Sequence, residues 1–142
     1  MNKAFCSNGE RVSQATINRR YSEALKKKHA GNPRPLCEGC EVLYADHNDH
    51  TIAQARCKVL HKTELIWNPD NFPSSCHTCH KEWEAFKSGE WLNHKNVEQR
   101  LRFLRQHDPE GFKTRIELTE LHLKQQQHDN DRRNRLQHEK EA

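Results

Sequence analysis

The sequence predicts a small α+β fold in which a middle module of short elements is flanked by helical segments. Three observations lead to this prediction. Of the 142 residues only 32% are hydrophobic and 31% are charged, so a large apolar core is out of reach. Two Cys-x-x-Cys pairs bracket the middle of the chain, and apolar residues on either side of it recur at helical spacing. A domain with so little apolar material usually needs a metal, disulfides or a partner to fold.

The N-terminal segment predicts one amphipathic helix. Apolar side chains recur every three or four residues between Ile17 and Leu25, and Ser13 stands where an N-cap is expected. The stretch AGNPRP then ends the helix, because glycine and two prolines cannot continue it. A helical arm therefore spans residues 1–33.

The charge is distributed unevenly along the chain. Residues 1–36 contain eight Lys/Arg and two Asp/Glu, a balance of +6, whereas residues 37–80 contain three and six, a balance of −3. A basic arm beside an acidic module suits a protein that binds a phosphate backbone and holds a divalent ion. A solvated helix face would account for the charge of the arm as well.

The rest of the chain divides into two further segments. The middle module, residues 34–88, has only short elements: a brief strand in EVLYA, loops around ELIW, and a helix that begins near Ser74 and ends at Gly89. The C-terminal region, residues 89–142, predicts two more helices, the second one capped by Asp108 and followed by proline. Its polar tail is either a solvated helix or frayed, and these helices could form a homodimer.

Four cysteines make the strongest motif. Cys37 and Cys40 form one pair, Cys76 and Cys79 form the other, and 35 residues separate the pairs. No apolar run at the N-terminus resembles a signal peptide, so we expect a cytoplasmic protein whose thiols stay reduced. Each Cys-x-x-Cys turn can place two thiolates on one tetrahedral ion. The sequence therefore predicts one structural Zn²⁺.

The sequence does not favour a haem protein or a membrane protein. The stretch CHTCH also matches the Cys-x-x-Cys-His pattern of covalent haem attachment, but that attachment is normally completed after export from the cytosol. No segment approaches the roughly 20 apolar residues that a membrane-spanning helix needs. We therefore expect neither haem nor a membrane partner.

Two Asp-His pairs lie between the cysteine pairs, in ADHNDHTIAQ. Histidine is the usual general base near neutral pH, and neighbouring side chains on a strand point to opposite sides. One residue of a pair can thus hold an ion while the other activates water. We favour Asp49 and His50 because the interval from Cys40 to His47 leaves little room for a strand; Asp46 and His47 are the alternative ligand and base. Eleven histidines in one chain also make chance pairs common.

The order Cys-x-x-Cys, Asp-His, Asn, Cys-x-x-Cys-His resembles the HNH nucleases of the ββα-metal superfamily. Asn71 precedes Cys76 by five residues, as it does in many phage and bacterial members. The stretch HNDH, residues 47–50, is similar to the His-x-Asp-His element of phage endonuclease VII-like nucleases. The resemblance spans residues 34–87, about two fifths of the chain. The chain departs from the family at Thr51, where many members have isoleucine directly after the histidine.

The resemblance implies a metal-dependent DNA endonuclease with a zinc-stapled ββα-metal module. His50 would be the general base, and Asn71 would brace the loop that orients it. Asp49 and His80 would hold a catalytic Mg²⁺ or Mn²⁺ against the scissile phosphate. The zinc held by the four cysteines would be structural only.

DNA would be the partner, in the host cytoplasm if a phage encodes the protein. The cations predicted to contact it are Arg19, Arg20, Lys26, Lys27, Lys28, Arg56, Lys58 and Lys62. The alternative function is a zinc-stapled module that binds nucleic acid without cutting it.

Overall fold

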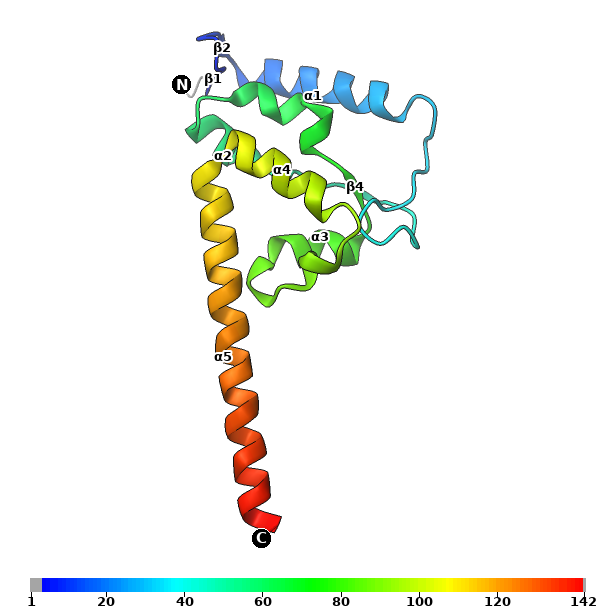
Figure 1. Cartoon of the computed structure of the whole chain (residues 1–142). Helices are drawn as coiled ribbons and strands as arrows, with labels where there is room; N and C mark the ends of the chain where they lie inside the picture. Colours follow the sequence, from blue (N-terminus) through cyan, green and yellow to red (C-terminus); the bar gives the residue numbers. More distant parts are fainter. Residues whose placement is uncertain (1–3, 142) are drawn as a thin grey trace.

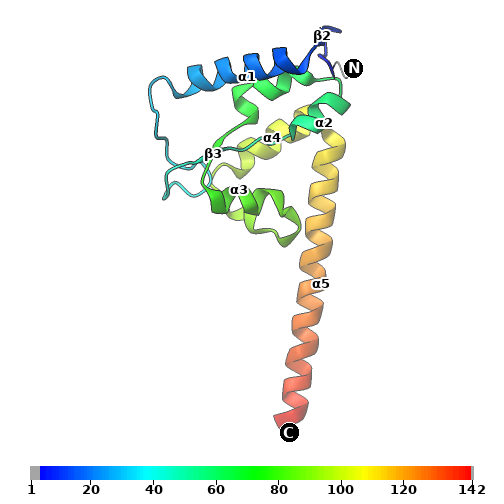
Figure 2. The same cartoon turned by 180° about the vertical axis from the view of Figure 1, so that it is seen from behind.

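The computed structural model describes residues 4–141 and confirms an α+β fold of helices with two small antiparallel sheets. Residues 1–3 of the predicted arm and residue 142 of the predicted tail lie outside this range. In both views, α1 (Gln14–His29) lies on one side of α4 (Val97–His107) and α3 (His77–Glu84) lies on the other (Figures 1 and 2). The long α5 (Pro109–Glu141) runs past α3 and continues well beyond the rest of the chain.

The first helix begins where the sequence predicts. Ser13 is its N-cap, and the Ser13 hydroxyl accepts a hydrogen bond from the Thr16 amide at 3.2 Å. The side chain of Ile17, on this helix, is buried. In front of α1, β1 (Ala4–Phe5) pairs with β2 (Arg11–Val12) in a short antiparallel hairpin.

The middle module contains a second two-residue pairing. β3 (His47–Asn48) runs antiparallel to β4 (Ser74–Ser75), with His47 opposite Ser75, and α3 follows β4 after one residue. Between the two strands lie α2 (Gln54–Val59) and the 3₁₀ helices η1 (Thr63–Trp67) and η2 (Pro69–Asn71). Chain segments far apart in sequence are thus joined beside the start of α3.

Three predictions for the elements of the module were wrong. The helix expected to end at Gly89 ends at Glu84, and the 3₁₀ helix η3 (Phe86–Ser88) follows it. The strand expected in EVLYA is reduced to one isolated bridge between Leu36 and Tyr44. The helix expected from Ser74 begins only at His77, because the backbone of Ser74 is already paired in β4. Cys76 is the N-cap of α3, where its sulfur accepts a hydrogen bond from the Cys79 amide at 3.5 Å.

One hydrophobic core draws on all three predicted segments. It contains Ile17 from the arm, Ile52 and Ile66 from the middle module, and Phe103 and Leu104 from α4. The boundaries near residues 33 and 88 stay predictions about sequence organisation, but the core crosses both of them. The helical arm therefore packs on the middle module and α4 through a shared hydrophobic core.

The C-terminal helices follow the predicted caps. The Asp108 carboxylate accepts a hydrogen bond from the Gly111 amide at 3.1 Å, and α5 starts at the next residue, a proline. Thr119 fastens α5 to η3 (Phe86–Ser88) by donating its hydroxyl hydrogen to the Phe86 carbonyl at 3.0 Å. The polar tail is an exposed helix up to Glu141. Among residues 4–141, no helix combines the length and apolar character that crossing a bilayer requires. A homodimer through these helices stays a prediction.

Candidate metal centre and adjoining cleft

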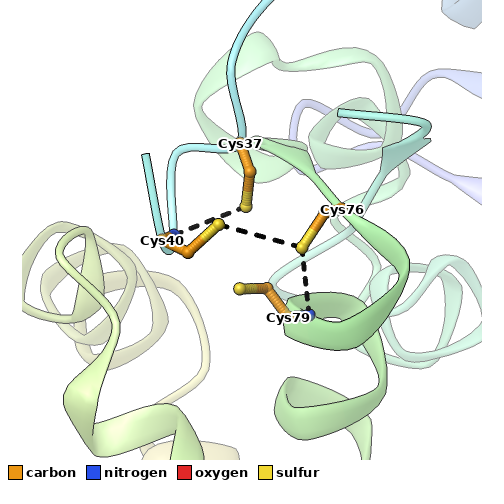
Figure 3. Close-up of side chains that lie close together, drawn as sticks. All are labelled: Cys37, Cys40, Cys76 and Cys79. Atoms are coloured by element: carbon orange, nitrogen blue, oxygen red, sulfur yellow. Dashed lines mark hydrogen bonds between the residues drawn. The ribbon is translucent and has the colours of Figure 1, made fainter. Parts of the chain in front are cut away.

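The four cysteines come together at one point. Cys37 and Cys40 lie on the loop before β3, and Cys76 and Cys79 lie at the start of α3, with the four side chains turned toward one another (Figure 3). All four sulfur atoms lie within 4.8 Å of one another, and the Cys40 and Cys76 sulfurs are 4.0 Å apart. Three of these cysteines are buried and Cys40 is partly buried. This donor set fits one tetrahedral zinc ion.

The backbone around the cysteines stabilises negatively charged sulfur. The amides of Gly39 and Cys40 donate to the Cys37 sulfur at 3.3 and 3.5 Å. Burial raises the pKa of Cys79, because a thiolate is poorly solvated there. The neighbouring sulfurs raise it further, because thiolates close together repel one another. Backbone amides of the following loop lower the pKa of Cys40 to about 7. A metal ion would remove the repulsion, since the thiolate is the form that binds metal.

A carboxylate–histidine pair that the sequence did not predict lies beside this cluster. His94 Nε2 is 3.0 Å from a Glu82 carboxylate oxygen, and a ring nitrogen of His94 lies within 4.8 Å of the Cys79 sulfur. His94 is 6% exposed, and its Nδ1 has no hydrogen-bond partner among the described residues. A Cβ at Gly39 would lie 3.1 Å from the Cys79 sulfur and 3.4 Å from the His94 ring, so the backbone of Gly39 approaches both closely. His94 is thus packed directly against the predicted zinc ligands.

A cleft of about 400 Å³ next to the cysteines contains the favoured catalytic residues. Asp49, His50 and His80 all line it. Asp49 Oδ1 lies 2.9 Å from His80 Nδ1, and His80 Nε2 lies 3.2 Å from a Glu84 oxygen. The pairing of β3 with β4 brings these side chains together, because Asp49 follows β3 and His80 lies on the first turn of α3. The predicted ion ligands are therefore neighbours, although 31 positions separate them in sequence.

The ring of His50 is fixed by a backbone carbonyl. Its Nε2 lies 3.0 Å from the carbonyl oxygen of Ile66. A carbonyl oxygen only accepts, so Nε2 carries the hydrogen and Nδ1 keeps its lone pair. The rings of Tyr21 and Phe72 pack on His50 with centroid separations of 5.0 and 5.6 Å. Burial lowers the pKa of His50, which keeps the ring neutral and able to accept a proton.

Asn71 ties together the two segments that hold His50. Its side-chain oxygen accepts from the Ile52 amide at 2.7 Å, and its NH₂ group donates to the carbonyls of Ile52 and Leu65 at 3.1 and 3.0 Å. Ile52 lies two residues after His50, and Leu65 immediately precedes Ile66. Asn71 is fully buried. It therefore connects the loop carrying His50 to the segment whose carbonyl holds the ring.

The alternative pair lies at the edge of the site. The Asp46 side chain is 63% exposed, and its carboxylate is 3.6 Å from His47 Nε2. His47 stacks on His80 with ring centroids 4.5 Å apart, and its Nε2 is 3.4 Å from His77 Nδ1. Neither Asp46 nor His47 lines the cleft. The geometry favours Asp49 and His50, although His47 does contact a predicted ion ligand.

Asp49 has a second partner that the sequence did not predict. Arg100 donates to Asp49 Oδ2 and to the Asp49 carbonyl, both at 3.0 Å, and to the Thr51 hydroxyl at 2.9 Å. Both charged side chains are 3% exposed. Helical spacing could have identified Arg100 as a buried residue, because it falls on the same face of α4 as Leu104.

A second arginine lines the cleft from α5. The Arg115 guanidinium carbon lies 3.6 Å from the Trp83 ring centroid, and one of its nitrogens donates to the Trp83 carbonyl at 3.0 Å. Arg115 lies outside the segment that carries the family resemblance. Sequence reasoning therefore had no motif that could have identified it.

The predicted DNA-contacting cations divide into two groups. Five of the eight have hydrogen-bond partners within the chain, and Arg20, for example, binds Glu10 through two nitrogens at 3.0 Å. The five are Arg20, Lys28, Arg56, Lys58 and Lys62. The other three are exposed on α1: Arg19, Lys26 and Lys27. Those three are the cations of the set most available to a partner.

Comparisons with known proteins identify no relative: no family model, no curated protein and no solved structure matches the chain. A functional interpretation therefore depends on the geometry of the site and on the order of its motifs.

Proposed function

We propose that the chain is a metal-dependent DNA endonuclease of the HNH type, in which β3, β4 and α3 form the ββα-metal unit. The observation that supports this best is the shared cleft of Asp49, His50 and His80, with Asp49 Oδ1 2.9 Å from His80 Nδ1. A general base and two ion ligands lie together there. The neighbouring four-cysteine cluster would hold a structural zinc.

In the proposed reaction His50 acts as the base. The Ile66 carbonyl holds its Nε2–H, so Nδ1 takes a proton from the water that attacks the phosphorus. Asp49 and His80 would hold the divalent ion, with Oδ1 as the Asp49 oxygen not taken by Arg100. That ion would supply positive charge to the phosphate and to the leaving 3′ oxygen.

The four cysteines have a positional role in this proposal. They fasten the loop before β3 to the first turn of α3, where His80 directly follows Cys79. Zinc there would keep His80 facing Asp49 without taking part in the reaction.

The test is nicking of supercoiled plasmid in Mg²⁺ or Mn²⁺. His50→Ala should lower the rate by about 10²–10⁴-fold, the usual contribution of a general base, with zinc content and DNA affinity unchanged. His47→Ala should cost much less, and His80→Ala should impair cleavage without releasing zinc. His128→Ala, on the exposed part of α5, is the matched control. Unimpaired nicking by the His47/His50 double variant would refute the assignment.

One observation favours the alternative, a zinc-stapled module that binds nucleic acid without cutting it. Both carboxylate oxygens of Asp49 already have partners within the chain, Arg100 and His80. In that case Asp49 would only hold α3 and α4 together. The alternative predicts DNA binding by the wild-type protein with no nicking in either metal ion.

A further inference from the structure

Arg115 is a partly buried cation that forms no ion pair with the described residues. It packs between the rings of Trp83, Phe86 and Trp91, with its guanidinium carbon 3.6 to 5.0 Å from their centroids. Its one hydrogen bond to the described residues goes to the Trp83 carbonyl, and no carboxylate there forms an ion pair with it. A guanidinium has five N–H donors, so most of them are left free of protein partners among the described residues.

The neighbouring charges do not neutralise Arg115. Asp49, the buried carboxylate of the cleft, is paired with Arg100. Glu84 has a side chain that is 65% exposed and contacts His80. Burial, followed by the charge of Arg100, lowers the pKa of Arg115. A guanidinium that is partly buried between aromatic rings, has no ion pair among the described residues and lines an open cleft is suited to bind an anion from outside the chain.

Arg115 lies where two surface hollows meet, and the two acidic residues of the second hollow, Asp108 and Glu110, are paired with Arg56. Arg115 lines the cleft of Asp49 and His80, and it also lines a second hollow of about 440 Å³ along the start of α5. Thr51, Ala53 and Phe86 also border both hollows, so the two adjoin at Arg115. A ligand that extended from one hollow to the other would pass Arg115 and the predicted catalytic residues in turn.

We propose that Arg115 is a phosphate-binding residue that holds a non-bridging oxygen of a DNA phosphodiester at the α5 side of the cleft. The plane of a guanidinium matches two phosphate oxygens, and stacking on Trp83 fixes that plane before the ligand arrives. The identity of the phosphate carrier as DNA rests on the proposed function. The capacity for phosphate rests on the unpaired guanidinium.

Arg115→Met tests this assignment, because methionine keeps an unbranched apolar stem against Trp83 and removes the charge. Arg115→Lys restores a cation without the planar fork. Arg133→Met, on the exposed part of the same helix, makes the same change about 27 Å farther along at 1.5 Å per residue. Each variant is compared with wild type in three measurements. The first is the rate of plasmid nicking with Mg²⁺, and the second is the affinity for a short DNA duplex with Ca²⁺ in place of Mg²⁺, at several salt concentrations. The third is the zinc content.

Arg115→Met should lower kcat/KM by on the order of 10²-fold, as the loss of one charge-stabilising donor typically does. Its salt dependence of duplex binding should fall by about 0.9 in logarithmic slope. Arg115→Lys should recover part of both, and Arg133→Met should stay within about threefold of wild type. Arg115→Met within about threefold of wild type would overturn the inference, as would a lysine variant no better than methionine.

The two proposals fail in different ways. If wild type binds the duplex and does not nick plasmid, the endonuclease proposal fails. The role of Arg115 is then decided by the Ca²⁺ binding data alone, where Arg115→Met must weaken binding more than Arg133→Met does. If wild type nicks and Arg115→Met nicks equally well, the phosphate site fails and the endonuclease proposal stands.

Discussion

Replacing Asn71 with alanine should destabilise the protein by about 4–6 kcal/mol. The change removes three hydrogen bonds to the backbone, two with Ile52 and one with Leu65, each worth about 1 kcal/mol net in a buried setting. It also leaves the buried Ile52 amide without an acceptor, and an unpaired buried donor costs about 1–3 kcal/mol. Because small domains are stable by only about 5–15 kcal/mol, this loss is a large part of the total.

Urea unfolding with zinc present, followed by tryptophan fluorescence, measures this loss. Asn18→Ala is the matched control, since Asn18 is exposed on α1 and its change should stay within about 0.5 kcal/mol. The folded Asn71→Ala protein should also nick plasmid more slowly, because the carbonyl that holds His50 lies next to Leu65. A loss of stability below about 1 kcal/mol would refute the bracing role.

Three further predictions follow from the site. Cys76→Ser, or removal of zinc by a chelator, should unfold the module, because structural zinc contributes about 10–16 kcal/mol of apparent binding energy. Circular dichroism and metal analysis measure this effect, and a folded zinc-free protein would contradict the prediction. The proposed reaction requires neutral His50, whose pKa burial lowers below its usual 6.5, so the rate of nicking should fall with decreasing pH only below pH 6.5. A midpoint above 6.5 in a pH–rate profile would exclude His50 as the base. Changing Arg19, Lys26 and Lys27 to glutamine should reduce the logarithmic salt slope of DNA binding by about 0.9 for each lost phosphate contact, and an unchanged slope would assign them to a solvated face.

The features that the sequence predicted are those set by local chemistry. Ser13 and Asp108 cap helices because their side chains reach amides three residues ahead, which needs no knowledge of the rest of the fold. The four-cysteine cluster was predictable as well, because a Cys-x-x-Cys turn places its own two sulfurs and a second turn supplies the rest. The strands were placed poorly, since a strand of two residues is too short to have a periodic pattern.

The charges around the cleft could not be predicted from the module alone. Arg100 and Arg115 lie on α4 and α5, and only the packing of these helices brings them to Asp49 and Trp83. A pattern limited to residues 34–87 identifies candidate ligands and a candidate base. It contains no information on which counter-charges the rest of the chain adds.

These counter-charges determine how strongly the cleft would hold an ion by itself. Mg²⁺ prefers anionic oxygen, and the one buried carboxylate here, Asp49, is already neutralised by Arg100. With Arg115 and Glu84 also lining it, the cleft without ligand attracts cations less than a bare Asp-His pair would. A bound phosphodiester would reverse this, because its negative charge compensates Arg115 and adds oxygen ligands beside Asp49 and His80. In the proposed nuclease the ion and the DNA would therefore bind cooperatively, and the ion would be held tightly only when there is a phosphate to cut.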